Sequence, residues 1–185
     1  MLLSIGMAVF VGLAAVTVTV TIQATGMARQ EALARSRLTA EAIGREAGDR
    51  LDVAIATART VAETSEGMML AKEKPTRALA DGVLQQLLTE NADFLAVWSV
   101  WEPGAFDGHD AEFAGRPGHD STGRFVPYRY RAPGQAVREP ATNYTTAGAG
   151  DYYLLAQRSS GEQVLEPYTR SIGGKSVFVT TLAVP

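Results

Sequence analysis

Aromatic and acidic side chains gather in the C-terminal half of this 185-residue chain. Both tryptophans lie in one short stretch, VWSVWEPGAFDGHD, in which a glutamate directly follows the second indole. The face of an indole or phenol ring attracts an organic cation by about 0.5–2 kcal/mol when the pair is desolvated. A carboxylate adds a charge-assisted hydrogen bond to an ammonium group. Rings and acids together therefore suit a cage for a positively charged small molecule. The rings are Trp98, Trp101, Tyr128, Tyr130, Tyr144, Tyr152, Tyr153 and Tyr168, and the acids are Glu102, Asp107, Asp151 and Glu166.

The same rings also suit a hydrophobic core, and their residue types alone do not separate the two roles. The stretch around the tryptophans has the composition of a strand, in which successive side chains point to opposite faces. Trp98 and Trp101 are three residues apart, so we expect them on opposite faces. At most one of the two indoles can then line a given pocket.

Catalysis is a further alternative. Two carboxylates drawn from the four acids would suit a hydrolase, although no Ser-His or Cys-His pattern accompanies them. The tripeptide Gly-His-Asp occurs twice, ending at Asp110 and Asp120. Histidines and carboxylates are zinc ligands, but both copies lie in a glycine-rich stretch that favours solvated turns. The sequence therefore predicts no catalytic residue, no metal site and no cofactor.

Composition excludes several classes of protein. A formal net charge of −3 and a pI near 5.4 argue against a nucleic-acid partner, which would need a basic surface. The chain has no cysteine, which excludes a disulfide scaffold and a thiolate zinc site. Its length suits one ordinary domain with an additional segment.

The first 28 residues carry no charged side chain. A helix of about 20 apolar residues spans the hydrocarbon layer of a membrane, so residues 1–28 predict a transmembrane anchor. A cleaved signal peptide is the alternative, but it usually has basic residues before a shorter apolar run. Arg29, Arg35 and Arg37 follow the anchor. By the positive-inside rule alone, they would place the rest of the chain in the cytoplasm.

Helix formers dominate residues 31–66 and predict one long helix after the anchor. Thr76, which follows a proline, predicts the cap of a second helix that ends near Asn91. Pro127 predicts that its strand is an edge strand or carries a bulge. A long helix, a shorter one and then antiparallel strands predict an α+β fold. Strands are expected at 94–101, 124–131, 163–168 and 175–184, with a glycine-rich loop at 102–123, a short helical or extended segment at 151–157 and a turn at 172–174.

Three stretches resemble the double Cache (dCache) sensor domains of bacterial methyl-accepting chemotaxis proteins. They are WSVWEPGAFDGHD, DSTGRFVPYRYR and GDYYLLAQRSSGEQVLEPYTRSIGGKSVFVTTLAVP, and the similarity extends over about residues 30–185. The resemblance implies an antiparallel, PAS-like sheet carried on the long helix, as in the membrane-distal module of such a domain. The proximal module and the cytoplasmic part would lie outside this chain.

The resemblance also implies a location and a partner. Residues 29–185 would form an extracytoplasmic domain in the periplasm, tethered to the inner membrane, in spite of the arginines after the anchor. Two copies would pair as a homodimer through the long helix.

The family binds small molecules in the distal module, beneath the loops between its strands. Subgroups similar to amino-acid receptors carry Arg-x-Trp-Tyr in one strand and an aspartate two residues past a later tyrosine. Here Phe-Val-Pro-Tyr follows Arg124, and Arg170 stands two residues past Tyr168. The resemblance therefore implies an amine or polyamine ligand. An organic acid held by Arg124, Arg129 or Arg170 is the alternative.

The sequence thus predicts a sensor without enzymatic activity that binds a small polar ligand for chemotaxis signalling. Alternatively, the domain is the sensor input domain of a histidine kinase or diguanylate cyclase and binds an organic acid or amino acid. The enzymatic alternative is a hydrolase anchored in the cell envelope. The predicted ring walls are Trp98, Tyr128 and Tyr153, and the predicted ammonium partners are Glu102, Asp107 and Asp151.

Overall fold

The computed structural model describes the backbone of residues 2–70 and 75–185, and the side chains of residues 23–70 and 75–185. Two compact units divide the chain, Met1–Asp49 and Arg50–Pro185. Helix α1 runs from Leu2 to Leu70, which confirms the predicted long helix. No helix among the described side chains is long and apolar enough to cross a membrane. The anchor predicted at 1–28 falls mainly on residues 1–22, whose side chains lie outside the described set.

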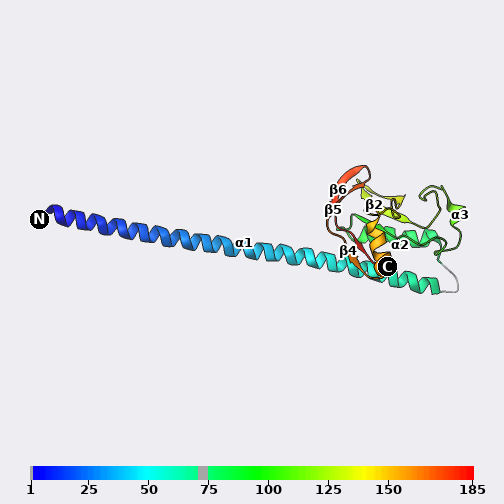
Figure 1. Ribbon diagram of the computed structural model, residues 1–185, viewed down its shortest axis with the longest axis horizontal. Helices are drawn as coiled ribbons and strands as arrows, with labels where there is room; N and C mark the ends of the chain where they lie inside the picture. Colours follow the sequence, from blue (N-terminus) through cyan, green and yellow to red (C-terminus); the bar gives the residue numbers. More distant parts are fainter. Residues whose placement is uncertain (1, 71–74) are drawn as a thin grey trace. The chain divides into compact units, whose positions relative to one another are not determined.

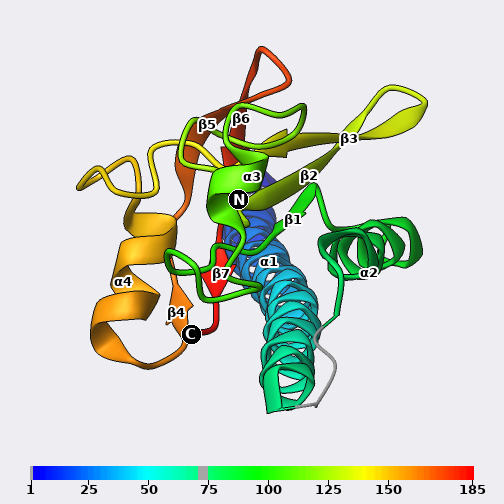
Figure 2. The ribbon, with the colours of Figure 1, turned by 90° about the vertical axis from the view of Figure 1, so that its right-hand side faces the viewer.

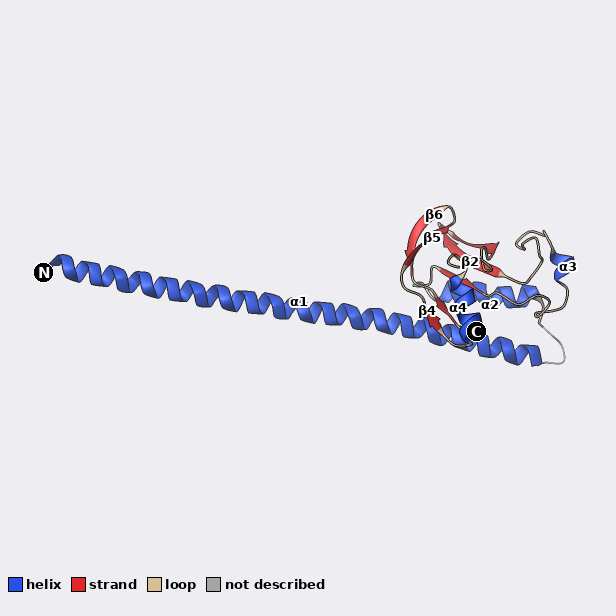
Figure 3. Ribbon diagram, viewed as in Figure 1, coloured by secondary structure: helices blue, strands red, loops and turns tan. Residues whose placement is uncertain are grey.

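The second unit is an α+β structure, as predicted, in which all paired strands are antiparallel (Figure 1 and Figure 3). Three small sheets replace the single sheet expected from the sequence. Their orders are β1-β2-β3, β4-β7 and β5-β6. The elements after α1 are α2 (Arg77–Glu90), β1 (Ala96–Trp98), α3 (Asp110–Phe113), β2 (Pro127–Ala132), β3 (Gln135–Pro140), α4 (Asp151–Ser159), β4 (Gln163–Val164), β5 (Tyr168–Ile172), β6 (Lys175–Val179) and β7 (Leu182–Ala183).

Helix α2 begins and ends where its capping residues predict. The Thr76 hydroxyl accepts a hydrogen bond from the backbone N–H of Leu79 at 3.2 Å, and Asn91 follows the last turn. The apolar face of the helix buries Leu84 and Leu88. Figure 2 shows α2 and α4 on opposite flanks of the sheets, with α2 beside β1 and β2. The helix therefore closes one side of the three-stranded sheet, away from α4.

The prediction that Pro127 lies in an edge strand or at a bulge is wrong. Strand β2 is the central strand of its sheet, and Pro127 is its first residue, opposite Pro140. A proline at the first position of a strand removes no internal ladder hydrogen bond, so it is tolerated there. Strand β3 was not expected from the sequence, because its charged residues hide the alternating pattern.

Two of the expected strands are interrupted. The segment expected at 163–168 divides into β4 and the start of β5, with Pro167, which has no N–H to donate, between them. The segment expected at 175–184 divides because β6 pairs with β5 whereas β7 pairs with β4. The turn between β5 and β6 is confirmed: Gly173 and Gly174 adopt φ of 56° and 75°, which suits a tight hairpin.

A core of mostly aromatic residues joins β2, α4 and β5. Partly buried residues from before the glycine-rich loop, among them Leu95 and Trp98, pack against this core, so the core forms only when distant segments meet. The strand and helix that carry most of the rings are thereby held next to each other. The buried residues are Val126, Tyr128, Tyr130, Ala141, Tyr144, Tyr152 and Ile172.

Candidate ligand-binding site

A pocket of about 240 Å³ lies beside helix α4. Two phenol rings, two leucines and two carboxylates surround it, so it offers both apolar and anionic surface. This is the combination that an organic ammonium group prefers. The lining residues are Gly148, Ala149, Asp151, Tyr152, Leu155, Leu165, Glu166 and Tyr168.

The start of α4 fixes one wall of this pocket. Asp151 is the first residue of the helix, where an acidic side chain suits the positive end of the helix dipole. Its carboxylate accepts a hydrogen bond from the backbone N–H of Gly148 at 2.9 Å. The next residue, Tyr152, is 1% exposed and donates from its hydroxyl to the Thr142 carbonyl at 2.8 Å. One helical turn therefore places a carboxylate and a ring at the pocket.

Of the six residues predicted to bind ligand, Asp151 is the one that lines this pocket. Trp98 and Tyr128 lie in the core behind it. The Trp98 ring packs edge-on against Tyr152, with centroids 5.1 Å apart. Tyr128 is 8% exposed, and burial raises the pKa of its phenol to about 12. Both rings therefore support the pocket wall from behind. Trp101 contacts a different ring, that of Phe106, so the two indoles do separate.

Glu102 and Tyr153 meet at a second place on α4. The Tyr153 hydroxyl and the Gln157 amide both donate to Glu102 Oε1. Arg124 lies 3.5 Å from the other carboxylate oxygen. Burial and the bond to Glu102 raise the pKa of Tyr153 to about 12. This cluster ties the loop after β1 to α4, and the carboxylate of Glu102 already has three partners there.

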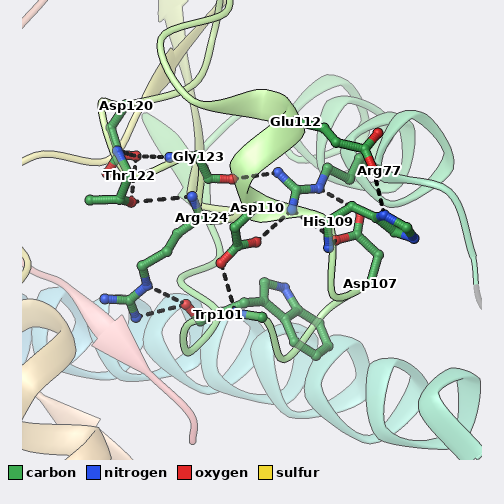
Figure 4. Close-up of polar contacts among 11 residues, drawn as sticks. Arg77, Trp101, Asp107, His109, Asp110, Glu112, Asp120, Thr122, Gly123 and Arg124 are labelled. Atoms are coloured by element: carbon green, nitrogen blue, oxygen red, sulfur yellow. Dashed lines mark hydrogen bonds and ion pairs between the residues drawn. The ribbon is translucent and has the colours of Figure 1, made fainter.

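Asp107 belongs to a cluster organised by Arg77 (Figure 4). The Arg77 guanidinium donates to both Asp107 oxygens, at 2.7 and 2.8 Å, and to Asp110 at 2.7 Å. It also donates to the Gly123 carbonyl at 2.7 Å. Its side chain is 5% exposed. Arg77 thus joins α2 to both ends of the glycine-rich loop, and Asp107 has a structural partner.

This ion pair makes stability depend on pH. Hydrogen bonding from Arg77 holds the pKa of Asp107 below its ordinary value of 3.8. A carboxyl group whose pKa is lower in the folded state than in the unfolded state stabilises the fold at pH values above its unfolded-state pKa. That stability is lost as the pH falls through the folded-state pKa. We expect the free energy of unfolding to decrease as the pH is lowered below about 4, and we expect a smaller decrease in Asp107→Asn. Urea unfolding of both proteins at several acidic pH values measures this decrease. If the free energy of unfolding falls equally steeply with pH in both proteins, the ion pair between Arg77 and Asp107 is not its cause.

Four residues outside the six predicted ligand-binding residues contribute to the pocket or its wall, and all four were among the rings, acids and arginines that the sequence offered as candidates. Tyr152, Glu166 and Tyr168 line it, and Arg170 stacks on the Tyr152 ring with 4.3 Å between its guanidinium carbon and the ring centroid. One signal was available: residues 168 and 170 share a face of their strand because side chains alternate. Nothing in the sequence indicated that this face meets α4.

The structure gives little support to the alternatives of a metal site and of a hydrolase. His109 contacts Glu112 at 2.7 Å, and the His119 ring stacks against Phe113. Among the described side chains, no cluster of three or more His, Asp or Glu is arranged to hold a metal ion. Of the four acids considered for hydrolysis, Asp151 and Glu166 share the pocket.

Comparison with known proteins finds relatives among bacterial receptors. No protein-family model matches the chain. It is 32% identical over 110 residues to the methyl-accepting chemotaxis protein TlpQ of Pseudomonas aeruginosa, a match that covers 53% of this chain and 15% of TlpQ.

Solved structures extend the likeness to the fold. The extracellular domain of mmHK1S-Z3, a predicted histidine kinase, is 31% identical with a TM-score of 0.58, covering 74% of this chain and 52% of that domain. Methyl-accepting chemotaxis protein X shares the fold at 22% identity and a TM-score of 0.51, covering 76% of this chain and 54% of that structure. The chain thus spans about half the length of these structures. It is homologous to the sensor domains of methyl-accepting chemotaxis proteins, and its structure is consistent with a Cache sensor domain.

Proposed function

We propose that this chain is the extracytoplasmic sensing module of a transmembrane chemoreceptor and has no enzymatic activity of its own. The observation that carries the proposal is a pocket with rings and acids in a fold shared with extracellular sensor domains. In this proposal, residues 1–28 anchor the chain in the inner membrane, and residues 29–185 form a ligand-binding domain in the periplasm. Binding would then be passed to α1.

The ligand we propose is a small amine or polyamine. The rings of Tyr152 and Tyr168 provide faces for an organic cation, worth about 0.5–2 kcal/mol each when desolvated. Asp151 and Glu166 provide carboxylates on the same pocket. A hydrogen bond to a charged group is worth about 1.5–3 kcal/mol, so rings and acids together could supply most of the ~8 kcal/mol of a micromolar site.

Replacing Asp151 by asparagine should weaken amine binding about tenfold or more, because it removes the charge on one ammonium partner. The asparagine oxygen can still accept the hydrogen bond from the Gly148 N–H, so the fold should persist. A thermal-shift screen of primary amines and polyamines on the full chain selects the ligand, and calorimetry measures its affinity.

Glu112→Gln is the matched control for this test. It removes one exposed carboxylate on α3 and should leave the affinity unchanged. An unaltered affinity in Asp151→Asn would remove this aspartate from the site. A screen without any binding amine would remove the proposed ligand class.

A second candidate output is a histidine kinase. The 31% identity to the extracellular domain of mmHK1S-Z3 favours it. The two outputs differ in the cytoplasm: a kinase receptor transfers phosphate from ATP to its own histidine, whereas a chemoreceptor does not. Autophosphorylation of the natural full-length receptor in membranes would therefore decide between them.

Pairing of two copies through α1 is also part of the proposal. Large apolar side chains on the first unit are exposed, among them Leu33, Leu38 and Ile43 at 62%, 65% and 62%. Exposed apolar surface on a helix suits a partner helix. Light scattering of the full chain in detergent tests it, and a monomer at all concentrations would remove the dimer.

A further inference from the structure

Arg170 on β5 reaches into the core beside the pocket. Its guanidinium carbon lies 5.0 Å from the ring centroid of Tyr128 and 4.3 Å from that of Tyr152. The first ring belongs to β2 and the second to α4. Three elements that are distant in the sequence therefore meet at this one cation, which is half-buried.

Other arginines at similar depth in this unit have carboxylate partners. Arg77, Arg124, Arg129 and Arg138 each lie within 3.5 Å of a carboxylate oxygen. Arg170 pairs with no carboxylate in the part of the chain whose side chains are described. Among the described arginines that are buried to this extent, Arg170 is therefore the one that stacks on rings in place of a carboxylate.

This arrangement holds a charge at some cost. Withdrawing a cation from water is unfavourable, and contact with two ring faces offsets only part of that cost. Burial acts to lower the pKa of Arg170, but the phenols of Tyr168, Tyr128 and Tyr152 outweigh it, so the pKa lies above its usual value. A guanidinium has five N–H donors. The neighbouring phenol oxygens of Tyr128, Tyr152 and Tyr168 cannot satisfy all five, so donors remain for a further acceptor.

The position of Arg170 connects it to the pocket. Tyr152, on which it stacks, lines the pocket, and so does Tyr168, which shares a face of β5 with Arg170. We infer that Arg170 is a carboxylate-binding subsite of the pocket, where its planar fork receives an acidic group of the sensed molecule. This inference rests on the sensing function proposed above and adds an anionic group to the ligand.

Acetate is the probe, because it carries the carboxylate and little else. Thermal unfolding of the full chain is followed as acetate replaces chloride at constant ionic strength. At concentrations several times its dissociation constant, acetate should raise the Tm of the unmodified chain by roughly 2–4 °C. Arg170→Gln should lose this shift. Arg158→Gln, which removes an exposed arginine on α4, should keep it. The inference is overturned if acetate has no effect on the unmodified chain or shifts Arg170→Gln equally.

If Arg170→Gln does not fold, Arg170→Lys provides a second test. Lysine retains the positive charge but cannot form the two parallel hydrogen bonds of the guanidinium fork. Its acetate shift should be at most about half that of the unmodified chain. A shift of full size would show that a general charge effect, and no fork, is responsible, and would overturn the inference.

The sensing function and the subsite fail in different ways. A metabolite screen without any binder would remove the sensing function, even where the acetate shift depends on Arg170. A sensed molecule whose affinity is the same in Arg170→Gln would remove the carboxylate subsite and leave the sensing function in place.

Discussion

Replacing Arg77 by alanine is expected to lower the free energy of unfolding by about 3–5 kcal/mol. The Arg77 side chain is 5% exposed, and its two acidic partners, Asp107 and Asp110, are 18% and 17% exposed. Without the guanidinium, two poorly solvated carboxylates face each other with no counter-charge. The Gly123 carbonyl also loses its donor. Urea unfolding of the full chain, followed by tryptophan fluorescence, measures the loss.

Arg116→Ala is the matched control for this prediction. Arg116 stacks on Phe113 with 5.4 Å to the ring centroid, and Arg77 stacks on the same ring at 4.0 Å. Arg116 is exposed, so its removal should cost at most about 1 kcal/mol. Similar losses in the two variants would mean that ring stacking, rather than the buried ion pairs, accounts for the role of Arg77.

Replacing Gly123 by alanine should cost about 2–5 kcal/mol, through two effects that add. Gly123 has φ of +71°, a conformation that costs a residue with a side chain about 1–2 kcal/mol. A Cβ there would also lie 1.9 Å from the Asp110 carbonyl oxygen and 2.6 Å from the Ala114 nitrogen. These are backbone atoms, so α3 and the loop would have to move apart. Chemical unfolding again provides the measurement.

Gly134→Ala separates the two effects. Gly134 has φ of +79° in the turn between β2 and β3, but no atom lies within 4 Å of the position of its Cβ. Only the backbone strain should then appear, about 1–2 kcal/mol. If both glycine variants lose the same free energy, the close approach of α3 to residue 123 is wrong.

Local signals predicted α1, α2 and the β5–β6 turn because the interactions that form them lie within a few residues, whereas α3 was not expected inside the glycine-rich loop. The Thr76 cap reaches Leu79, three residues away, and the two glycines of the β5–β6 turn adopt the positive φ that their residue type permits. Strand boundaries were less accurate. Val179 and Leu182 belong to different sheets, and a change of partner between them leaves no mark in the alternation of residue types.

The candidate site shows the same division. Composition identified rings and acids as the chemistry of the C-terminal half, and Asp151 does line the pocket. Asp107 has the same residue type, yet its oxygens lie against Arg77, thirty positions earlier in the chain. A carboxylate pairs with whichever cation the packed chain brings within hydrogen-bonding distance, and residue type does not encode that choice.

The sequence by itself determined the long helix, the α+β class and the kind of chemistry the C-terminal half can perform, because periodicity, caps and residue types act over short distances. Only the tertiary structure decided which rings are buried in the hydrophobic core and which line the candidate pocket. Trp98 and Tyr128 lie behind Tyr152 because the Tyr152 ring of α4 packs into the core that contains them. The same packing places Arg170 between the rings of Tyr128 and Tyr152, since burial and pairing depend on contacts between segments far apart in the chain.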